Sequence, residues 1–136
     1  MNEIKTLQTT KKFSHASITD FSLFTGKLFL KDSIDTTSCE ISIGSLDSGQ
    51  SIPFFHSHKQ DEEIYIILAG SGVFQIDDEI IDIEKGSFIR VATGSDRCFK
   101  CTSTETMVYI CIQAKQNSLE QCTMEDGVIT ERVSKL

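Results

Sequence analysis

Short runs of alternating apolar and polar residues make up most of this chain. In the clearest run, the apolar residues Cys39, Ile41 and Ile43 alternate with Ser38, Glu40 and Ser42. A period of two is typical of a half-buried β-strand, whereas the spacing of an amphipathic helix is nearly absent. Glycine-containing turns separate the runs. The pattern therefore predicts an all-β fold built from many short strands.

The same pattern places successive strands along most of the chain. The expected strands cover residues 27–31, 38–43, 63–69, 73–76, 79–83, 87–91, 97–102 and 107–114, with a further extended stretch over 52–58. Asp77-Asp78 is the shortest connection, as in a tight hairpin. Eight or more short strands at regular spacing predict a closed or double-sheet barrel, which also removes exposed sheet edges.

The two ends of the chain lack this alternation. Residues 1–20 are polar and weakly patterned, so we expect an N-terminal arm or lead-in there. The barrel is expected over 21–115, and residues 116–136 form a polar C-terminal tail. A chain of 136 residues fits one domain and can bury a core without disulfides or a structural metal.

Charge and cysteine content restrict the partners and the compartment. The formal net charge of −7 argues against a nucleic-acid partner and against an anionic membrane surface. No apolar stretch reaches the length of a signal peptide or a membrane span. The five cysteines are an odd number, which favours free thiols in a reducing compartment. We therefore expect a cytoplasmic protein.

One stretch combines three side chains that bind metals. His56 and His58 lie two residues apart, so in an extended segment their imidazoles share a face, and Glu63 begins the next expected strand. Two imidazoles and one carboxylate form a triad suited to a divalent transition metal such as iron, manganese, nickel or zinc, with open positions for water or substrate. Glu62 is the alternative carboxylate, expected in a solvated loop.

The spacing around these residues resembles a known family. His56-x-His58-x4-Glu63-x6-Gly70 is similar to the first motif of the cupin superfamily, and of its small single-domain cupin 2 type. A degenerate second motif follows: Gly86, five residues, Ala92-Thr93-Gly94, two residues, Arg97, three residues, Cys101. The resemblance implies a double-stranded β-helix (jelly-roll) barrel that commonly binds one divalent metal through three histidines and one glutamate.

The second motif departs from the family at its metal ligand. Arg97 stands where the resemblance implies the third histidine, and arginine cannot donate to a metal. In one picture, His56, His58 and Glu63 hold the metal and Arg97 orients an anionic ligand beyond it. In the other, no metal binds and Arg97 pairs with Glu63, because a buried carboxylate needs a positive partner.

Three classes of function remain open. The first is a metal-dependent enzyme, in which Tyr65 or Tyr109 would have to transfer protons. The second is a module without turnover that binds a small polar or anionic molecule through Arg97 and Tyr65. The third is a sensory or structural barrel that forms a homodimer, with residues 1–20 as a contact arm.

Several other side chains have an ordinary structural interpretation beside the functional one. The aromatic residues either line a ligand pocket or fill the core, and they are Phe54, Tyr65, Phe88, Phe99 and Tyr109. Cys98 and Cys101 have no second cysteine pair at zinc-ribbon spacing, so we interpret them as strand residues on opposite faces.

Overall fold

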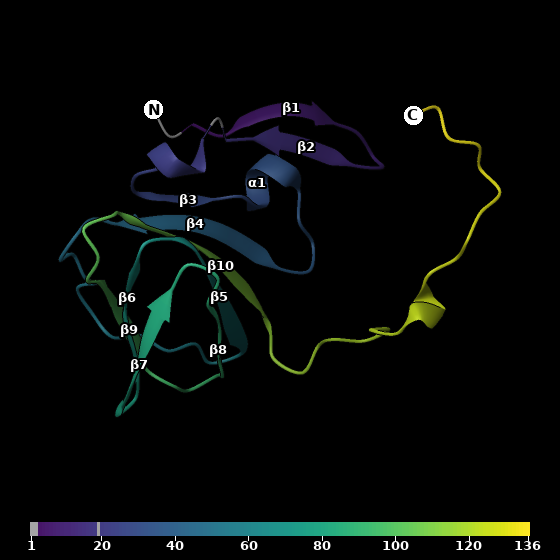
Figure 1. Cartoon of the computed structure of the whole chain (residues 1–136). Coiled ribbons are helices and arrows are strands. Elements are labelled where there is room, and N and C mark those ends of the chain that lie inside the picture. Colours follow the sequence, from purple (N-terminus) through teal and green to yellow (C-terminus); the bar gives the residue numbers. More distant parts are fainter. Residues whose placement is uncertain (1–2, 19) are drawn as a thin grey trace.

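The computed structural model describes residues 3–18 and 20–136, and antiparallel strands dominate it (Figure 1). The larger sheet has five strands, in the order β3 (Lys27–Phe29), β4 (Glu40–Leu46), β10 (Met107–Lys115), β5 (Asp61–Ala69) and β8 (Phe88–Val91). The second sheet has three, in the order β7 (Glu79–Glu84), β6 (Ser71–Ile76) and β9 (Arg97–Cys101). The helical elements are single turns, η1 (Phe21–Leu23), α1 (Lys31–Ile34) and η2 (Met124–Asp126).

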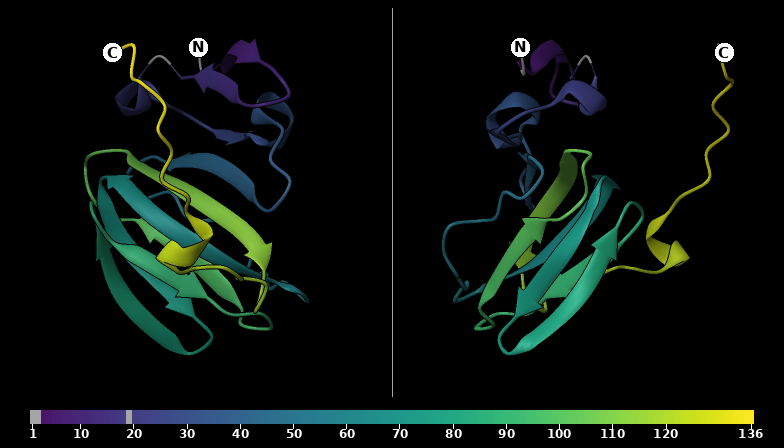
Figure 2. Two further views of the ribbon diagram at one scale, coloured as in Figure 1. Left: turned by 90° about the vertical axis from the view of Figure 1, so that its right-hand side faces the viewer. Right: turned by 60° about the vertical axis from the view of Figure 1, so that its left-hand side comes forward.

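The two larger sheets pack face to face around the main hydrophobic core (Figure 2). Phe74 and Phe99 stack at its centre, with ring centroids 5.1 Å apart, and Tyr65 meets both rings edge-on. Gly70 turns the chain from β5 into β6 with φ of 73°, and a Cβ there would lie 2.7 Å from the Met107 backbone. Only glycine fits this turn. The predicted all-β double-sheet barrel is confirmed.

The register of the larger sheet determines which residues face its interior. Alternate residues of a strand point to opposite faces, and directly paired residues share a face. The pairing places three interior rows across the strands: Lys27, Gly44 and Tyr109; Phe29, Ser42, Cys111 and Tyr65; and Glu40, Gln113 and Glu63. On the opposite face, Leu28 packs against a smaller cluster of Phe24, Ile43 and Val108. These rows form one wall of the pocket described below.

Several boundaries differ from the sequence prediction. β5 begins at Asp61 rather than at Glu63, because Asp61 pairs with Lys115 at the end of β10. The strand predicted over 27–31 ends at Phe29, and the chain turns helically over α1 before β4 begins at Glu40. The extended stretch over 52–58 is irregular, with single bridges from Ser51 and His56 to β9.

The cysteine interpretation agrees with the structure. Cys98 and Cys101 lie on β9, where the Cys101 side chain is buried in the core and the Cys98 thiol donates to the Ile52 carbonyl at 3.1 Å. All five cysteines are free thiols.

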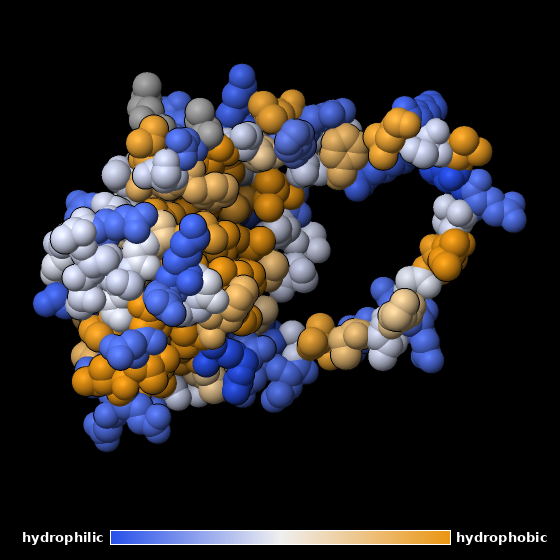
Figure 3. Space-filling view, in the orientation of Figure 1, coloured by the Kyte–Doolittle hydropathy of each residue, from blue (hydrophilic) through white to orange (hydrophobic). Residues whose placement is uncertain are grey.

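The segments outside the barrel are more exposed. The predicted arm contains a hairpin of β1 (Lys5–Thr9) and β2 (Ser14–Ser17), while residues 1–2 and 19 of that arm lie outside the described residues. The tail from residue 116 leaves the barrel, and hydrophobic and hydrophilic residues intersperse along it (Figure 3). Across the described ranges, none of the helices has the length and apolar character needed to cross a membrane.

Candidate metal centre and pocket

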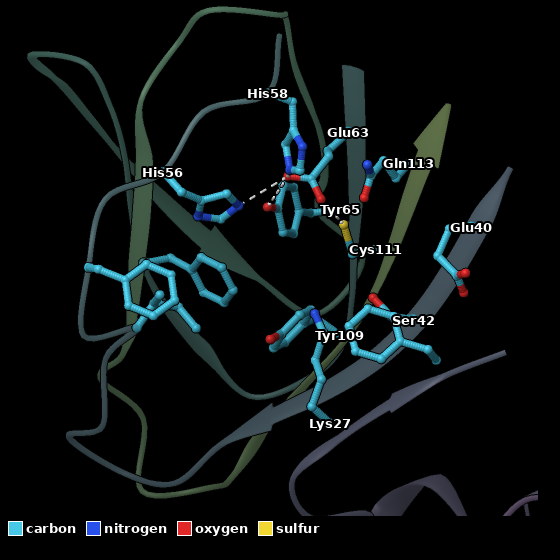
Figure 4. A pocket seen from close by; sticks show the side chains of 14 residues that line it. Lys27, Glu40, Ser42, His56, His58, Glu63, Tyr65, Tyr109, Cys111 and Gln113 are labelled. Carbon is cyan, nitrogen blue, oxygen red and sulfur yellow. Dashed lines mark hydrogen bonds and ion pairs between the residues drawn. The ribbon is translucent and has the colours of Figure 1, made fainter. Parts of the chain in front are cut away.

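A pocket of about 370 Å³ opens into the barrel between the two sheets (Figure 4). Its walls are mainly aromatic and apolar, from Phe29, Ile52, Phe54, Tyr65, Phe99 and Tyr109. Its polar lining consists of Lys27, Glu40, Ser42, His56, His58, Glu63, Cys111 and Gln113. Phe88 is not among the lining residues, because its side chain is 73% exposed on the outer face of β8. The other four aromatic candidates do line the pocket.

The predicted triad converges at one side of this pocket. The Nε2 atom of His56 lies 3.5 Å from Glu63 Oε1, and that of His58 lies 3.2 Å from the same oxygen. The three potential ligand atoms lie within 4.8 Å of one another. Glu62, the alternative carboxylate, points elsewhere and pairs with Arg90 at 3.1 Å. The choice of Glu63 over Glu62 agrees with this geometry.

Backbone hydrogen bonds hold the histidine segment in place. The His56 amide donates to the Arg97 carbonyl at 3.3 Å, and the Arg97 amide donates back to His56 at 3.0 Å. The Gly94 amide donates to the His58 carbonyl at 2.9 Å. The segment of the first motif is therefore fastened to the loop and strand of the second, which brings the two motifs to one site.

Glu63 is a buried carboxylate with two side-chain donors. The Tyr65 hydroxyl donates to Oε1 and the Cys111 thiol donates to Oε2, each at 2.9 Å. Burial would raise the pKa of Glu63, but these hydrogen bonds and the charges of His58 and Arg97 outweigh it and lower the pKa. Glu63 is therefore ionised at neutral pH, the state that binds a metal ion.

The donors around Glu63 keep their protons. Burial, and the neighbouring Glu63 charge, raise the pKa of the Cys111 thiol to about 12. Burial is also the main reason that the pKa of Tyr65 lies far above its usual value, and it raises the pKa of Tyr109 to about 12. At neutral pH these phenols are hydrogen-bond donors and acids rather than bases.

Arg97 lies behind the triad and not on the pocket surface. Its side chain has no exposed surface, and its Nε atom lies 3.6 Å from Glu63 Oε1. Nη1 donates to the His56 carbonyl at 3.1 Å, while Nε and Nη2 have no hydrogen-bond partner in the described chain. Arg97, predicted to bind a ligand, therefore contacts Glu63 from the core side and is not among the residues that line the pocket. Tyr65, the other residue predicted to bind a ligand, does line the pocket.

The ligand chemistry fits a divalent transition metal. Burial, with the charges of Arg97 and His58, lowers the pKa of His56 against the attraction of Glu63. His56 is thus neutral at neutral pH, and a neutral imidazole carries the lone pair that binds metals. Two imidazoles and a carboxylate form a suitable donor set. Arg97 opposes the metal, because its fixed positive charge lies beside the shared carboxylate.

Sequence reasoning missed two contributors to the site. Cys111 had no motif to mark it, and only the pairing of β10 with β5 brings its thiol to Glu63. Lys27 lies in β3, far from both motifs, yet it lines the pocket. The alternation over residues 27–31 was the only available signal, and it does not say which face is interior.

Comparison with known proteins identifies the barrel region. The cupin domain family model matches residues 42–113. A cupin protein of known structure from Bacteroides fragilis is 39% identical, with a TM-score of 0.81, and the match covers 89% of this chain and 99% of that one. No curated protein matches the chain.

More distant structures share only the fold. A predicted oxalate decarboxylase from Thermotoga maritima is 24% identical over 55% of this chain and 64% of that one, with a TM-score of 0.53. A cupin 2 conserved barrel domain protein from Salinispora arenicola is 19% identical over 59% and 66%, respectively, also with a TM-score of 0.53. At these identities the matches support the fold of the barrel and no particular activity.

Proposed function

The chain belongs to the cupin family, and we propose that it binds a divalent transition metal through His56, His58 and Glu63 and a small polar or anionic molecule in the adjoining pocket. The convergence of both Nε2 atoms on Glu63 Oε1, at 3.5 and 3.2 Å, carries the proposal. A metal held there would act as a Lewis acid towards a ligand oxygen. The candidate metals are iron, manganese, nickel and zinc, and the loading experiment below distinguishes them.

The surrounding residues would prepare the site for binding. Tyr65 and Cys111 donate to the two oxygens of Glu63 and fix the orientation of the carboxylate. The aromatic walls exclude water from a ligand, which strengthens polar interactions inside the pocket. Tyr65 would contact the ligand through its ring and act on the metal through Glu63.

A second candidate is a metal-free binding or sensory barrel. The contact of 3.6 Å between Arg97 Nε and Glu63 Oε1 favours it, because the arginine already balances the buried carboxylate. In that case the pocket would bind an organic molecule without a cation at its floor, and Arg97 would replace the metal's charge.

Metal content distinguishes the two candidates. Protein purified without a His tag would be loaded with each metal in turn, dialysed and measured by plasma mass spectrometry. We expect about one equivalent in the wild type and its loss in His56→Ala. His15→Ala is the matched control, because His15 is exposed on β2, away from the pocket. Protein that stays empty with all four metals would favour the metal-free barrel instead.

We also propose that the chain forms a homodimer through its N-terminal arm. All five residues of β1 are exposed, and the hairpin presents Leu7 and Phe13, which are about half exposed, to solvent. A two-stranded hairpin has little stability on its own. Sedimentation at micromolar concentration should give the mass of a dimer, and Leu7→Lys should shift it towards the monomer. A monomeric wild type would exclude this contact.

A further inference from the structure

A lysine faces the pocket from a strand outside the part of the chain that matches the family. Lys27 belongs to β3, whereas the family match begins at residue 42. Its ammonium lies 5.3 Å from the ring centroid of Tyr109 and 5.5 Å from that of Phe29. In Figure 4 the side chain rises beside Tyr109, away from His58 and Glu63. The pocket thus has a cationic side as well as a metal-binding side.

The sheet register builds this arrangement. Lys27 pairs with Gly44, which in turn pairs with Tyr109, so the three residues form one interior row. A Cβ on Gly44 would lie 2.3 Å from the Tyr109 ring, so the ring occupies the space that any other residue would fill. The missing side chain lets the lysine and the tyrosine meet across the intervening strand. The register of the sheet therefore fixes the position of Lys27 in this wall of the pocket.

The Lys27 charge has no carboxylate partner among the residues that the structure describes. None of the ion pairs between described residues involves Lys27. Glu40, the other carboxylate at this wall besides Glu63, accepts instead from the Lys31 amide at 3.1 Å. Within the described residues, the ammonium of Lys27 therefore faces aromatic rings and no anion.

The distance between the two polar sides limits the ligand. On β10, the row of Lys27 contains Tyr109 and the row of Glu63 contains Gln113, four residues further along. At about 3.3 Å per residue, the backbones of the two rows are about 13 Å apart along the strand, and the Lys27 ammonium reaches towards the row between them, 5.5 Å from the Phe29 ring centroid. Apolar and aromatic side chains line the space between them. A molecule that reaches both sides must be longer than a single carboxylate, and its middle part meets mainly aromatic and apolar side chains.

We propose that Lys27 binds the carboxylate of an elongated small acid, whose apolar body lies against Phe29 and Tyr109 and whose far end faces His56, His58 and Glu63. The role of the far end rests on the proposed metal site, whereas the role of Lys27 does not. Lys27 thereby selects acids over neutral molecules of the same shape. Lys27 is an exposed residue that also lines the pocket, so an entering ligand can reach it.

The test compares a charged probe with its neutral isostere. Isothermal titration calorimetry would measure 4-phenylbutyrate and 4-phenylbutyramide binding to the wild type, Lys27→Met and Lys31→Met, with metal content determined on each sample. Methionine keeps most of the lysine stem against the aromatic rings. Lys31 is the control because it lies in α1, near the same edge, but does not line this pocket. The net charge changes equally in both variants.

We expect the wild type to prefer the acid about tenfold or more, which corresponds to about 1.4 kcal/mol. Lys27→Met should lose that preference and Lys31→Met should keep it.

A preference that survives in Lys27→Met, or a wild type that binds neither probe or both equally, overturns the proposal. A preference lost only when the metal is chelated also overturns it, and leaves the metal site standing. If the preference for the acid is lost in Lys27→Met while the protein never retains metal, the result supports the role of Lys27 and refutes the metal site.

Discussion

The two polar sides of the pocket are built on different principles. Around Glu63, the supporting contacts are buried: the carboxylate accepts from Tyr65 and Cys111, and Arg97 lies behind it with no exposed surface, while the two histidines are partly exposed on the pocket side. Around Lys27, the strand is three residues long, the side chain is exposed, and its contacts are with aromatic ring faces. Removing one group on the Glu63 side leaves its buried partner without a hydrogen bond or an opposite charge. Removing the Lys27 ammonium leaves no buried polar group without a partner among the described residues.

The Glu63 side of the pocket is suited to holding a fixed geometry, and the Lys27 side is suited to exchanging water for a ligand. A buried network holds its atoms in one geometry and is costly to disturb, because each partner depends on the others. An exposed cation over aromatic rings contributes little to folding and is free to exchange water for a ligand anion. We therefore expect changes at the Glu63 side to alter stability and metal binding together, and changes at the Lys27 side to alter only ligand selection.

The largest effect should follow from Glu63→Gln. The substitution removes the charge that balances Arg97 and leaves a guanidinium uncompensated in the core, which costs about 3–5 kcal/mol. Urea unfolding monitored by circular dichroism would measure the loss. Glu62→Gln is the control, because its ion pair with exposed Arg90 is worth about 1 kcal/mol or less. Equal losses in the two variants would contradict the network described for Glu63.

Arg97→His should come next, with a gain in metal affinity of about tenfold, or about 1.4 kcal/mol. The Arg97 backbone is paired directly with His56, and Nε already lies 3.6 Å from Glu63 Oε1, so an imidazole there can add a fourth donor. The change also removes the opposing charge. Competition with a chelator of known affinity would measure it. Arg90→His, on the exposed face of β8, should leave metal affinity unchanged.

Tyr65→Phe should cost about 1 kcal/mol in the free energy of unfolding, because it deletes one hydrogen bond to Glu63 and keeps the ring. Metal affinity should fall as well, since Glu63 loses a donor that orients it. Tyr109→Phe is the matched control, because no hydrogen bond of the Tyr109 hydroxyl occurs among the described residues. A larger loss in Tyr109→Phe than in Tyr65→Phe would reverse this ranking.

Lys27→Met should have the smallest effect on folding, within about 0.5 kcal/mol of the wild type. Thermal unfolding without ligand would test this expectation. A substantial loss of stability would mean that Lys27 is structural, and the contrast between the two sides of the pocket would disappear.

The parts that sequence reasoning reached are those with short-range signals. Alternation located the strands of the barrel to within a few residues, and the spacing of His56, His58 and Glu63 brought together side chains that do converge. The burial of Arg97 depends on its pairing with His56, which is 41 residues away. The position of Lys27 in the pocket likewise depends on its register with Gly44 and Tyr109. Pairings between residues far apart in the chain cannot be predicted from the local alternation of apolar and polar residues.

The position of β3 at the edge of its sheet links ligand binding to local unfolding. β3 pairs with β4 only, and through three residues, so it belongs to the part of the molecule that opens at low free-energy cost. A molecule bound by Lys27 is released whenever that strand detaches. By mass action, ligand binding should therefore slow amide hydrogen exchange at residues 27–29, because exchange there requires the strand to detach and the ligand to leave.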